Sequence, residues 1–239
     1  MKYLALYLRA PMQSWGASSK FGDRGTLDAP TRSGLIGLLA AACGIDKNNE
    51  AYERGWLARA ARLTFVVYAF HRGDRMTDYH TVGARYDKED SWQKKMIPTT
   101  SERKARGTDL THRDYLTDSV FGAVLSGDDE MIDEMTTGLM APVWGIWLGR
   151  KSCVPTEPVL CGIYNSAEDA KSALSHRYIA SQKRHGLSSS EESIVFIVSE
   201  SQSEYADDTY IDLPVSFARR EFQARRIHYM EVDSPMESD

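Results

Sequence analysis

Five short groups of basic and aromatic side chains are the parts of this sequence best suited to chemistry. Arginine can hold a phosphate group through paired hydrogen bonds, and aromatic rings can stack on unpaired bases. The net charge is −5, so contacts with a nucleic acid must come from local clusters rather than from a bulk basic surface. Each group alone is more often a set of solvated charges, but five together favour RNA binding. The candidate contacts are Gln13, Trp15, Arg32, Ser33, Tyr79, His80, Arg85, Arg150, Lys151, Arg219 and Arg220.

The start of one helix is a candidate anion site. Residues 30–44 predict a helix, because Thr31 is a good N-cap, Gly44 stands where a C′ glycine belongs, and apolar residues form a stripe between them. The first turn has no acidic residue and holds Arg32 and Ser33 instead. Unpaired backbone N–H groups beside an arginine and a hydroxyl suit an anion such as a phosphate group. The alternative is an ordinary buried helix with a solvated arginine.

Signs of catalysis and of metal binding are few. The six histidines include no i,i+4 pair, and the three cysteines lack metal-ligand spacing, so we expect neither a metal nor a cofactor. The cysteines are typical of core thiols in a reducing compartment. Metal-free RNA cleavage remains an alternative, with His80 as a general base beside Tyr79 and Arg85. Binding without reaction is the preferred interpretation.

The predicted elements follow a β-α-β-β-α-β order that is interrupted by an arm. This order is typical of ferredoxin-like and RRM-like folds, so the predicted class is α+β, with a four-stranded antiparallel sheet and helices on one face. Residues 71–115 are densely charged and aperiodic, which predicts a projecting arm that is partly ordered only against a partner. The predicted strands are 2–9, 63–70, 116–125 and 143–149, and the predicted helices are 30–44, 50–61 and 127–139.

The rest of the chain is predicted to form a small β-rich C-terminal part. The expected division is therefore an RRM-like domain at 1–155, which includes the arm, and a second part at 156–239. No run is long and apolar enough to cross a membrane, and the N-terminus does not resemble a signal peptide, so we expect a cytoplasmic protein. Within the second part we expect strands at 159–164, 194–198 and 227–232, a helix at 166–175 and a mobile loop at 176–192.

Five stretches that span nearly the whole chain carry a family resemblance. In these stretches, which occur in the family's order along the sequence, the chain resembles the CasD-type subunits of type I-E CRISPR Cascade complexes. These subunits belong to the RAMP superfamily. The matching stretches include Pro-Met-Gln-Ser-Trp-Gly, Pro-Thr-Arg-Ser-Gly-Leu and Asp-Tyr-His-Thr-Val. The five stretches are 10–16, 30–39, 78–85, 148–153 and 217–221.

The resemblance implies an RRM-like domain, a projecting thumb and a non-catalytic subunit that grips the 5′ handle of the CRISPR RNA. The 71–115 arm would be the thumb, which lies against the RNA and the adjacent backbone subunit, and the large PAM-recognising subunit would be another neighbour. Some relatives outside the type I-E branch cut the repeat RNA with tyrosine, lysine and histidine, but no such triad can be placed here.

On that resemblance we expect one set of residues to contact phosphates and another to contact bases. The expected phosphate contacts are Arg32, Arg150, Lys151, Arg219 and Arg220, and the expected base contacts are Gln13, Trp15, Tyr79 and His80.

Overall fold

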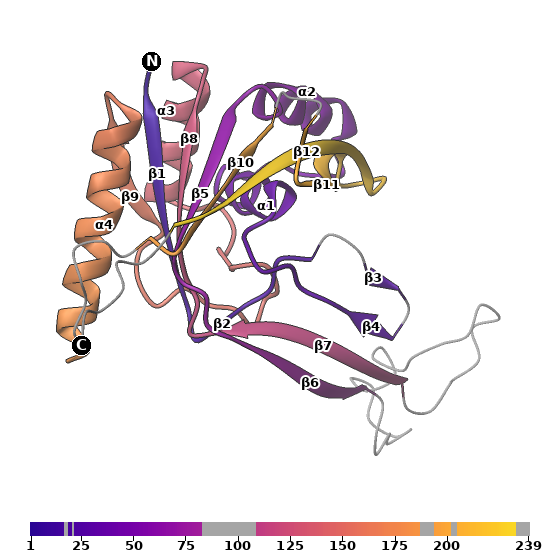
Figure 1. Cartoon of the computed structure of the whole chain (residues 1–239). Helices are drawn as coiled ribbons and strands as arrows, with labels where there is room; N and C mark the ends of the chain where they lie inside the picture. Colours follow the sequence, from indigo (N-terminus) through magenta and orange to yellow (C-terminus); the bar gives the residue numbers. More distant parts are fainter. Residues whose placement is uncertain (17–18, 21, 83–108, 187–193, 202–204, 233–239) are drawn as a thin grey trace.

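A large antiparallel sheet organises the molecule, and a long hairpin projects from one end of it (Figure 1). The computed structural model describes residues 1–16, 19–20, 22–82, 109–186, 194–201 and 205–232. Within these residues the main sheet has seven strands in the order β11-β12-β10-β5-β8-β1-β9. Its strands are β1 (Tyr3–Arg9), β5 (Thr64–His71), β8 (Val120–Ser126), β9 (Leu160–Tyr164), β10 (Phe196–Glu200), β11 (Asp208–Ser216) and β12 (Glu221–Glu231).

Four neighbouring strands at one end of this sheet confirm the predicted α+β class. These strands, β5, β8, β1 and β9, stand in the order expected of a ferredoxin-like fold, with all neighbours antiparallel. The fourth strand, however, is β9 and not the predicted strand 143–149. That segment caps α1 (Arg32–Ala42) instead, because the N–H groups of Val143 and Trp144 donate to the carbonyl oxygens of Ala42 and Ala41.

Helices cover both faces of the sheet, so the prediction that they lie on one face is wrong: α4 (Ala167–Arg184) lies on the side opposite to α1 and α2 (Glu50–Ala60) (Figure 1). The predicted helix starts are confirmed at Thr31, whose hydroxyl oxygen accepts from the Gly34 N–H, and at Ser166. The mobile loop predicted at 176–192 is wrong for 176–184, because α4 continues and buries Tyr178 and Ser181. Helix α3 spans Asp129–Met140.

Strands on both sides of the predicted division at 155 belong to the same sheet. Strand β9 completes the ferredoxin-like core beside β1, and β10 pairs with the other edge of this core, along β5. Strand β12 then pairs with β10, and β11 pairs with β12. The division into two parts stays a prediction, but the strands of the second part extend the sheet of the first.

The hairpin is formed by β6 (Asp74–Val82) and β7 (Asp109–Thr117), which pair over their full lengths. The arm predicted at 71–115 is therefore regular at both ends, and its centre, 83–108, lies outside the described residues. The strands were missed because charged residues along both faces obscure the alternation that marks a half-buried strand. Short strands complete this second sheet beside β7: β2 (Met12–Gln13), β3 (Ser19–Lys20) and β4 (Asp23–Arg24).

Candidate nucleic-acid interface

A shallow groove of about 270 Å³ lies at the N-terminus of α1, near the base of the hairpin. Two phenyl rings, one guanidinium and several hydroxyls and glycines meet there from distant parts of the chain. Such a mixture offers stacking, charge and backbone contact in one place, which are the interactions that single-stranded nucleic acids require. The lining residues are Ser14, Gly16, Gly25, Thr31, Ser33, Gly34, Gly149, Arg150, Phe217 and Phe222.

Close backbone approaches form the floor of this groove. Gly149 has a φ of +101°, and a Cβ there would lie 1.8 Å from the carbonyl oxygen of Ser14. A Cβ at Gly34 would lie 2.7 Å from Cε3 of Trp15. Both positions therefore require glycine, and they let the 14–16 loop pack directly against the start of α1.

Arg150 is the best-positioned cation of the groove. Its guanidinium donates to the carbonyl oxygens of Asp114, at 2.9 Å, and Arg24, and it lies 4.7 Å from the centre of the Tyr115 ring. These acceptors hold the side chain in place but carry no net charge, so the guanidinium charge stays available to an anion. Lys151 is exposed next to it, with Nζ 5.6 Å from the Trp147 ring centre.

The turn between β11 and β12 supplies the aromatic wall. Phe217 and Phe222 meet edge to face with ring centroids 6.3 Å apart, and Arg219 and Arg220 lie between them in sequence. Both arginines are exposed; Arg219 pairs with Glu50 of α2 at 2.7 Å, and Arg220 adopts a left-handed φ of +56°. The arginine pair was predicted, whereas the two phenylalanines were not proposed as contacts.

A buried carboxylate that sequence reasoning missed holds this turn. Glu53 of α2 is 1% exposed and accepts hydrogen bonds from the N–H groups of Phe217, at 2.9 Å, and Ala218, at 3.1 Å. It also accepts from the Ser216 hydroxyl at 2.9 Å. The sequence signal was only a glutamate on the same helix as Trp56 and Leu57, which does not reveal a partner so distant along the chain.

Gln13 and Trp15 are buried, which does not support the predicted base contacts. Gln13 is 0% exposed and donates to the carbonyl oxygens of Leu8 and Ser119, at 3.1 and 2.7 Å. Its remaining amide oxygen accepts from the Trp15 indole N–H at 3.1 Å. This set of internal hydrogen bonds ties the end of β1 to the loop before β8, so both residues position the groove from beneath.

Arg32 is also buried, at 4% exposure, and its placement does not support the predicted phosphate contact. The guanidinium pairs with Glu200, donates to the carbonyl oxygens of Ala61 and Leu63, and lies over the Phe65 ring. Burial, together with the nearby charge of Arg225, lowers the pKa of Arg32 to about 10. Arg32 therefore joins α1 to the main sheet.

The start of α1 holds an anion, but this anion is a side chain of the protein and not the bound ligand that the sequence predicted. A carboxylate oxygen of Asp212, on β11, accepts from the backbone N–H of Arg32 at 2.7 Å. Asp212 is 0% exposed, and Arg225 neutralises it through two hydrogen bonds. The helix start is thus already occupied by a side-chain carboxylate, and Ser33 is the member of the predicted pair that lines the groove.

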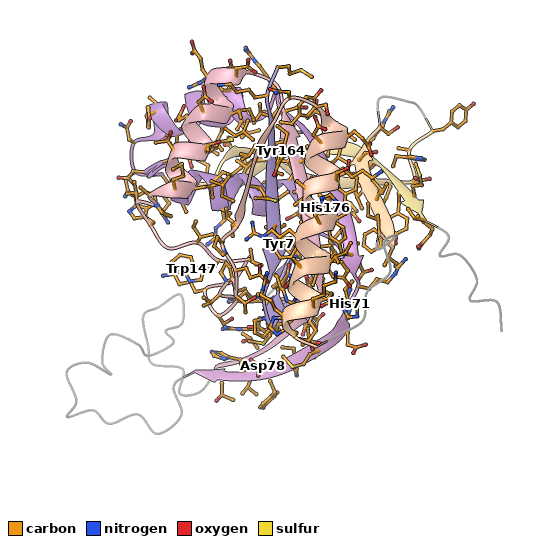
Figure 2. All side chains as sticks on the ribbon, turned by 90° about the vertical axis from the view of Figure 1, so that its left-hand side faces the viewer. Tyr7, His71, Asp78, Trp147, Tyr164 and His176 are labelled. Carbon is orange, nitrogen blue, oxygen red and sulfur yellow. The ribbon has the colours of Figure 1, made fainter. Side chains whose placement is uncertain are left out.

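Tyr79 and His80 lie on the hairpin, on opposite faces of β6, because successive side chains of a strand alternate. Tyr79 is 59% exposed, stands opposite His112 of β7 and contacts its ring at a centroid distance of 5.5 Å. His80 lies 3.8 Å from Asp78, measured between Nδ1 and a carboxylate oxygen. Figure 2 labels Asp78 on the β6–β7 hairpin. The predicted contact Arg85 lies outside the described residues.

The sheet face opposite α1 cannot serve as an open RNA-binding surface. In RRM domains aromatic side chains of the sheet stack on bases. Here α4 covers the aromatic residues Tyr7, Tyr68 and Phe70 of this face, and Tyr178 stacks on Phe70 at a centroid distance of 5.1 Å. Figure 2 shows α4 crossing in front of β1, with Tyr7 beside it.

The described residues hold no evident centre for metal or thiol chemistry. Among them, no three histidine, cysteine, aspartate or glutamate side chains gather where they could hold a metal ion. Burial raises the pKa of Cys43 to about 11 and also raises the pKa of Cys153, which makes both thiols poor nucleophiles. In the same part of the chain, no helix is long and apolar enough to span a bilayer.

Known proteins are similar to this chain in sequence and in fold over nearly their whole lengths. The Escherichia coli (strain K12) CRISPR system Cascade subunit CasD is 31% identical over 230 residues, which cover 92% of this chain and 94% of CasD. A chain of a solved CRISPR RNA-guided surveillance complex has a TM-score of 0.67 at 27% identity, with 98% of this chain and 91% of that chain covered.

A second solved structure supports the fold alone. It is described as a crystal structure of a Cas protein, with a TM-score of 0.66 at 24% identity and coverage of 96% of this chain and 94% of that chain. The family model described as "CRISPR-associated protein (Cas_Cas5)" matches residues 3–229. The chain therefore belongs to the Cas5 family of CRISPR-associated proteins.

Proposed function

We propose that this protein is a subunit of a Cascade-type surveillance complex and that it binds the 5′ handle of the CRISPR RNA in the groove beside α1. Its similarity to CasD and to a chain of a surveillance complex supports the assignment to such a complex. The observation that carries the RNA-binding proposal is the groove itself, where Arg150 and the Phe217–Phe222 pair face one space.

The chemistry of the groove fits one or two splayed nucleotides. A phenyl ring can stack on any base, Arg150 can pair with a phosphate group, and the Ser33 hydroxyl and the backbone can bond a ribose or a base edge. The exposed Lys151, Arg219 and Arg220 add charge at or next to the groove. The handle is thus held by stacking and backbone contacts rather than by a bulk basic surface.

The hairpin is proposed as the contact to the rest of the complex. Exposed Tyr79 and His112 form a ring pair that can stack on RNA, and β6 leaves one edge unpaired among the described strands. The backbone subunit and the large PAM-recognising subunit are the proposed neighbours, as the resemblance to CasD-type proteins implies.

Binding rather than cleavage is the proposed activity. The alternative is RNA cleavage with His80 as a general base beside Tyr79 and Arg85. Tyr79 and His80 lie on opposite faces of β6, so their side chains do not point toward one phosphate group. Incubation with labelled repeat RNA in EDTA should leave the RNA intact. Site-specific cleavage that His80→Ala abolishes would overturn this part of the proposal.

The binding proposal is tested with Arg150→Gln and the matched control Arg62→Gln, which replaces an exposed arginine just after α2. We expect Arg150→Gln to weaken the binding of a synthetic handle RNA by about tenfold or more, because a charge-assisted phosphate contact is lost. Arg62→Gln should bind like the wild type. Equal affinities of the two variants, with circular dichroism showing both folded, would contradict the proposed site.

A further inference from the structure

A second cavity of about 460 Å³ lies at the opposite side of the hairpin base, where the end of β1 meets the C-terminal end of α4. It is larger than the groove beside α1, and the proposed function does not use it. Its polar lining comes from β1, the end of β5, the turn before β8, the segment before β9, and the C-terminal end of α4 with its C-cap; these residues are Arg9, His71, Asp118, Thr156, Gln182 and His185. Figure 2 labels His71 beside the lower part of α4.

The cavity combines one guanidinium with two imidazoles. Arg9 is fixed at its rim, because its guanidinium contacts the Ser181 hydroxyl and the Gln182 side-chain oxygen. Nδ1 of His71 lies 3.0 Å from the carbonyl oxygen of Asp118, so this nitrogen carries a hydrogen and the ring is oriented. His185 is the C-cap residue of α4. Three groups that can carry positive charge thus line one hollow.

The acidic residues around the cavity do not cancel this charge. Asp118 is the carboxylate among the described lining residues, and its side chain is exposed. Glu157 lies behind the rim, where it accepts from Ser181, but it already pairs with Arg184 at 2.9 Å and with Arg177 at 3.7 Å. The excess of cationic groups therefore faces the cavity.

We propose that this cavity binds the phosphate group of a nucleotide. Arg9 and the two imidazoles suit a phosphate group, and the volume is in the range of small-molecule sites. Gln182 donates one amide hydrogen to the Tyr178 hydroxyl, and the Thr156 hydroxyl donates to the carbonyl oxygen of Arg9. The second amide hydrogen of Gln182 and the lone pairs of the Thr156 oxygen suit a ribose. The site is separate from the groove beside α1, so it goes beyond the proposed function. The phosphate can belong to a free nucleotide or to the end of an RNA strand.

The direct test uses AMP, with adenosine as the uncharged control, and follows the histidine ring signals of the full-length protein by NMR at pH 6. AMP should shift the His71 and His185 signals, whereas adenosine should not. His176, exposed on α4 two and a half turns earlier, is the internal control and should stay unchanged. Equal shifts with adenosine, or none with AMP, would overturn the proposal.

Variants then separate this site from the groove. The double variant His71→Ala, His185→Ala should bind AMP at least about tenfold more weakly, whereas His176→Ala should bind it like the wild type. Loss of AMP binding in Arg150→Gln would place AMP in the groove and overturn the proposal. Unchanged AMP binding in the double variant would overturn it as well.

The source of the phosphate is distinguished with short single-stranded RNAs that carry either a 5′-phosphate or a 5′-hydroxyl, added to Arg150→Gln protein. A preference for the 5′-phosphate that depends on His71 and His185 supports the end of an RNA strand as the ligand. AMP binding without that preference supports a free nucleotide. Failure of handle binding at the groove would leave both results intact, so the two proposals can fail independently.

Discussion

Two arginines near the α1 groove have opposite environments. The guanidinium of Arg32 faces inward to Glu200 and two carbonyl oxygens, and the backbone at this helix start donates to Asp212. Arg150 lines the groove and bonds only carbonyl oxygens among its described hydrogen-bond partners. The comparison teaches that an arginine beside a helix start can indicate a site for an anion. Whether a ligand can fill that site depends on whether an acidic side chain from a distant part of the chain already does so.

The largest expected effect concerns the buried network around Arg32. Asp212→Ala would leave Arg225 without its buried partner and remove the carboxylate at the start of α1. We expect a loss of about 3–5 kcal/mol in the free energy of unfolding. Urea unfolding at pH 7 measures it. A loss below about 1 kcal/mol would show that this network is not structural and would reopen the helix start as a ligand site.

An intermediate effect is expected at Glu53, a buried residue of α2 that holds the turn between β11 and β12. Glu53→Ala leaves the N–H groups of Phe217 and Ala218 without their acceptor, at an expected cost of about 1–3 kcal/mol of stability. Because this turn positions Phe217 beside Phe222 at the start of β12, handle affinity should fall as well. Loss of stability with unchanged RNA affinity in the folded fraction would separate the turn from the binding site.

A smaller effect is expected for Lys151, on the exposed side of the comparison. If Lys151 contacts a phosphate, Lys151→Gln should lower the slope of log affinity against log salt concentration by about 0.7. Lys47→Gln, which removes another exposed lysine, is the control. Handle binding measured between low and moderate salt gives both slopes. An unchanged slope for Lys151→Gln would remove Lys151 from the interface.

The smallest effect concerns Glu157, which joins α4 to the segment before β9. Burial alone would raise the pKa of Glu157, but hydrogen bonds from Ser181 and Arg184 and the charges of Arg184 and Arg177 outweigh it and hold the pKa below 4.5. The ionised form is therefore favoured by folding, and its contribution is present above about pH 4.5 and lost as the pH falls through the lowered value.

Glu157→Gln should accordingly reduce stability at pH 7 by less than about 1 kcal/mol, since the arginine pairs are partly solvated. The difference from the wild type should be smaller at about pH 3 than at pH 7, because the carboxyl becomes increasingly protonated as the pH falls. Urea unfolding at the two pH values measures this change. A difference that grows on acidification would contradict the sign of the pKa shift.

The sequence predicted elements with strong local signals and missed those that depend on distant partners. Thr31 and Gly44 marked α1, and Asp129 and Glu130 marked the first turn of α3, because caps and dipoles act within a few residues. The role of 143–149 as a cap of α1 depends on contacts with Ala41 and Ala42, a hundred residues earlier. No local pattern reports such a contact.

The candidate site was predicted in the same partial way. Ser33 and Arg150 line the groove, and Lys151 follows Arg150. Polar and basic residues near predicted loops were enough to suggest these three residues. Gln13 and Trp15 have side chains that can also contact a ligand at the surface. Only the fold shows that they are buried and hydrogen-bond to each other. Side-chain chemistry was thus readable from the sequence, whereas the direction in which each side chain points was not.

Crosslinking of the assembled complex tests the proposed RNA site most directly. A handle RNA that carries 4-thiouridine is irradiated in the complex, and the attached peptides of this subunit are identified by mass spectrometry. The groove predicts crosslinks to the segment around Phe217 and Phe222 and to the segment around Arg150. Crosslinks confined to α4 or to the opposite edge of the main sheet, at β9, would contradict it.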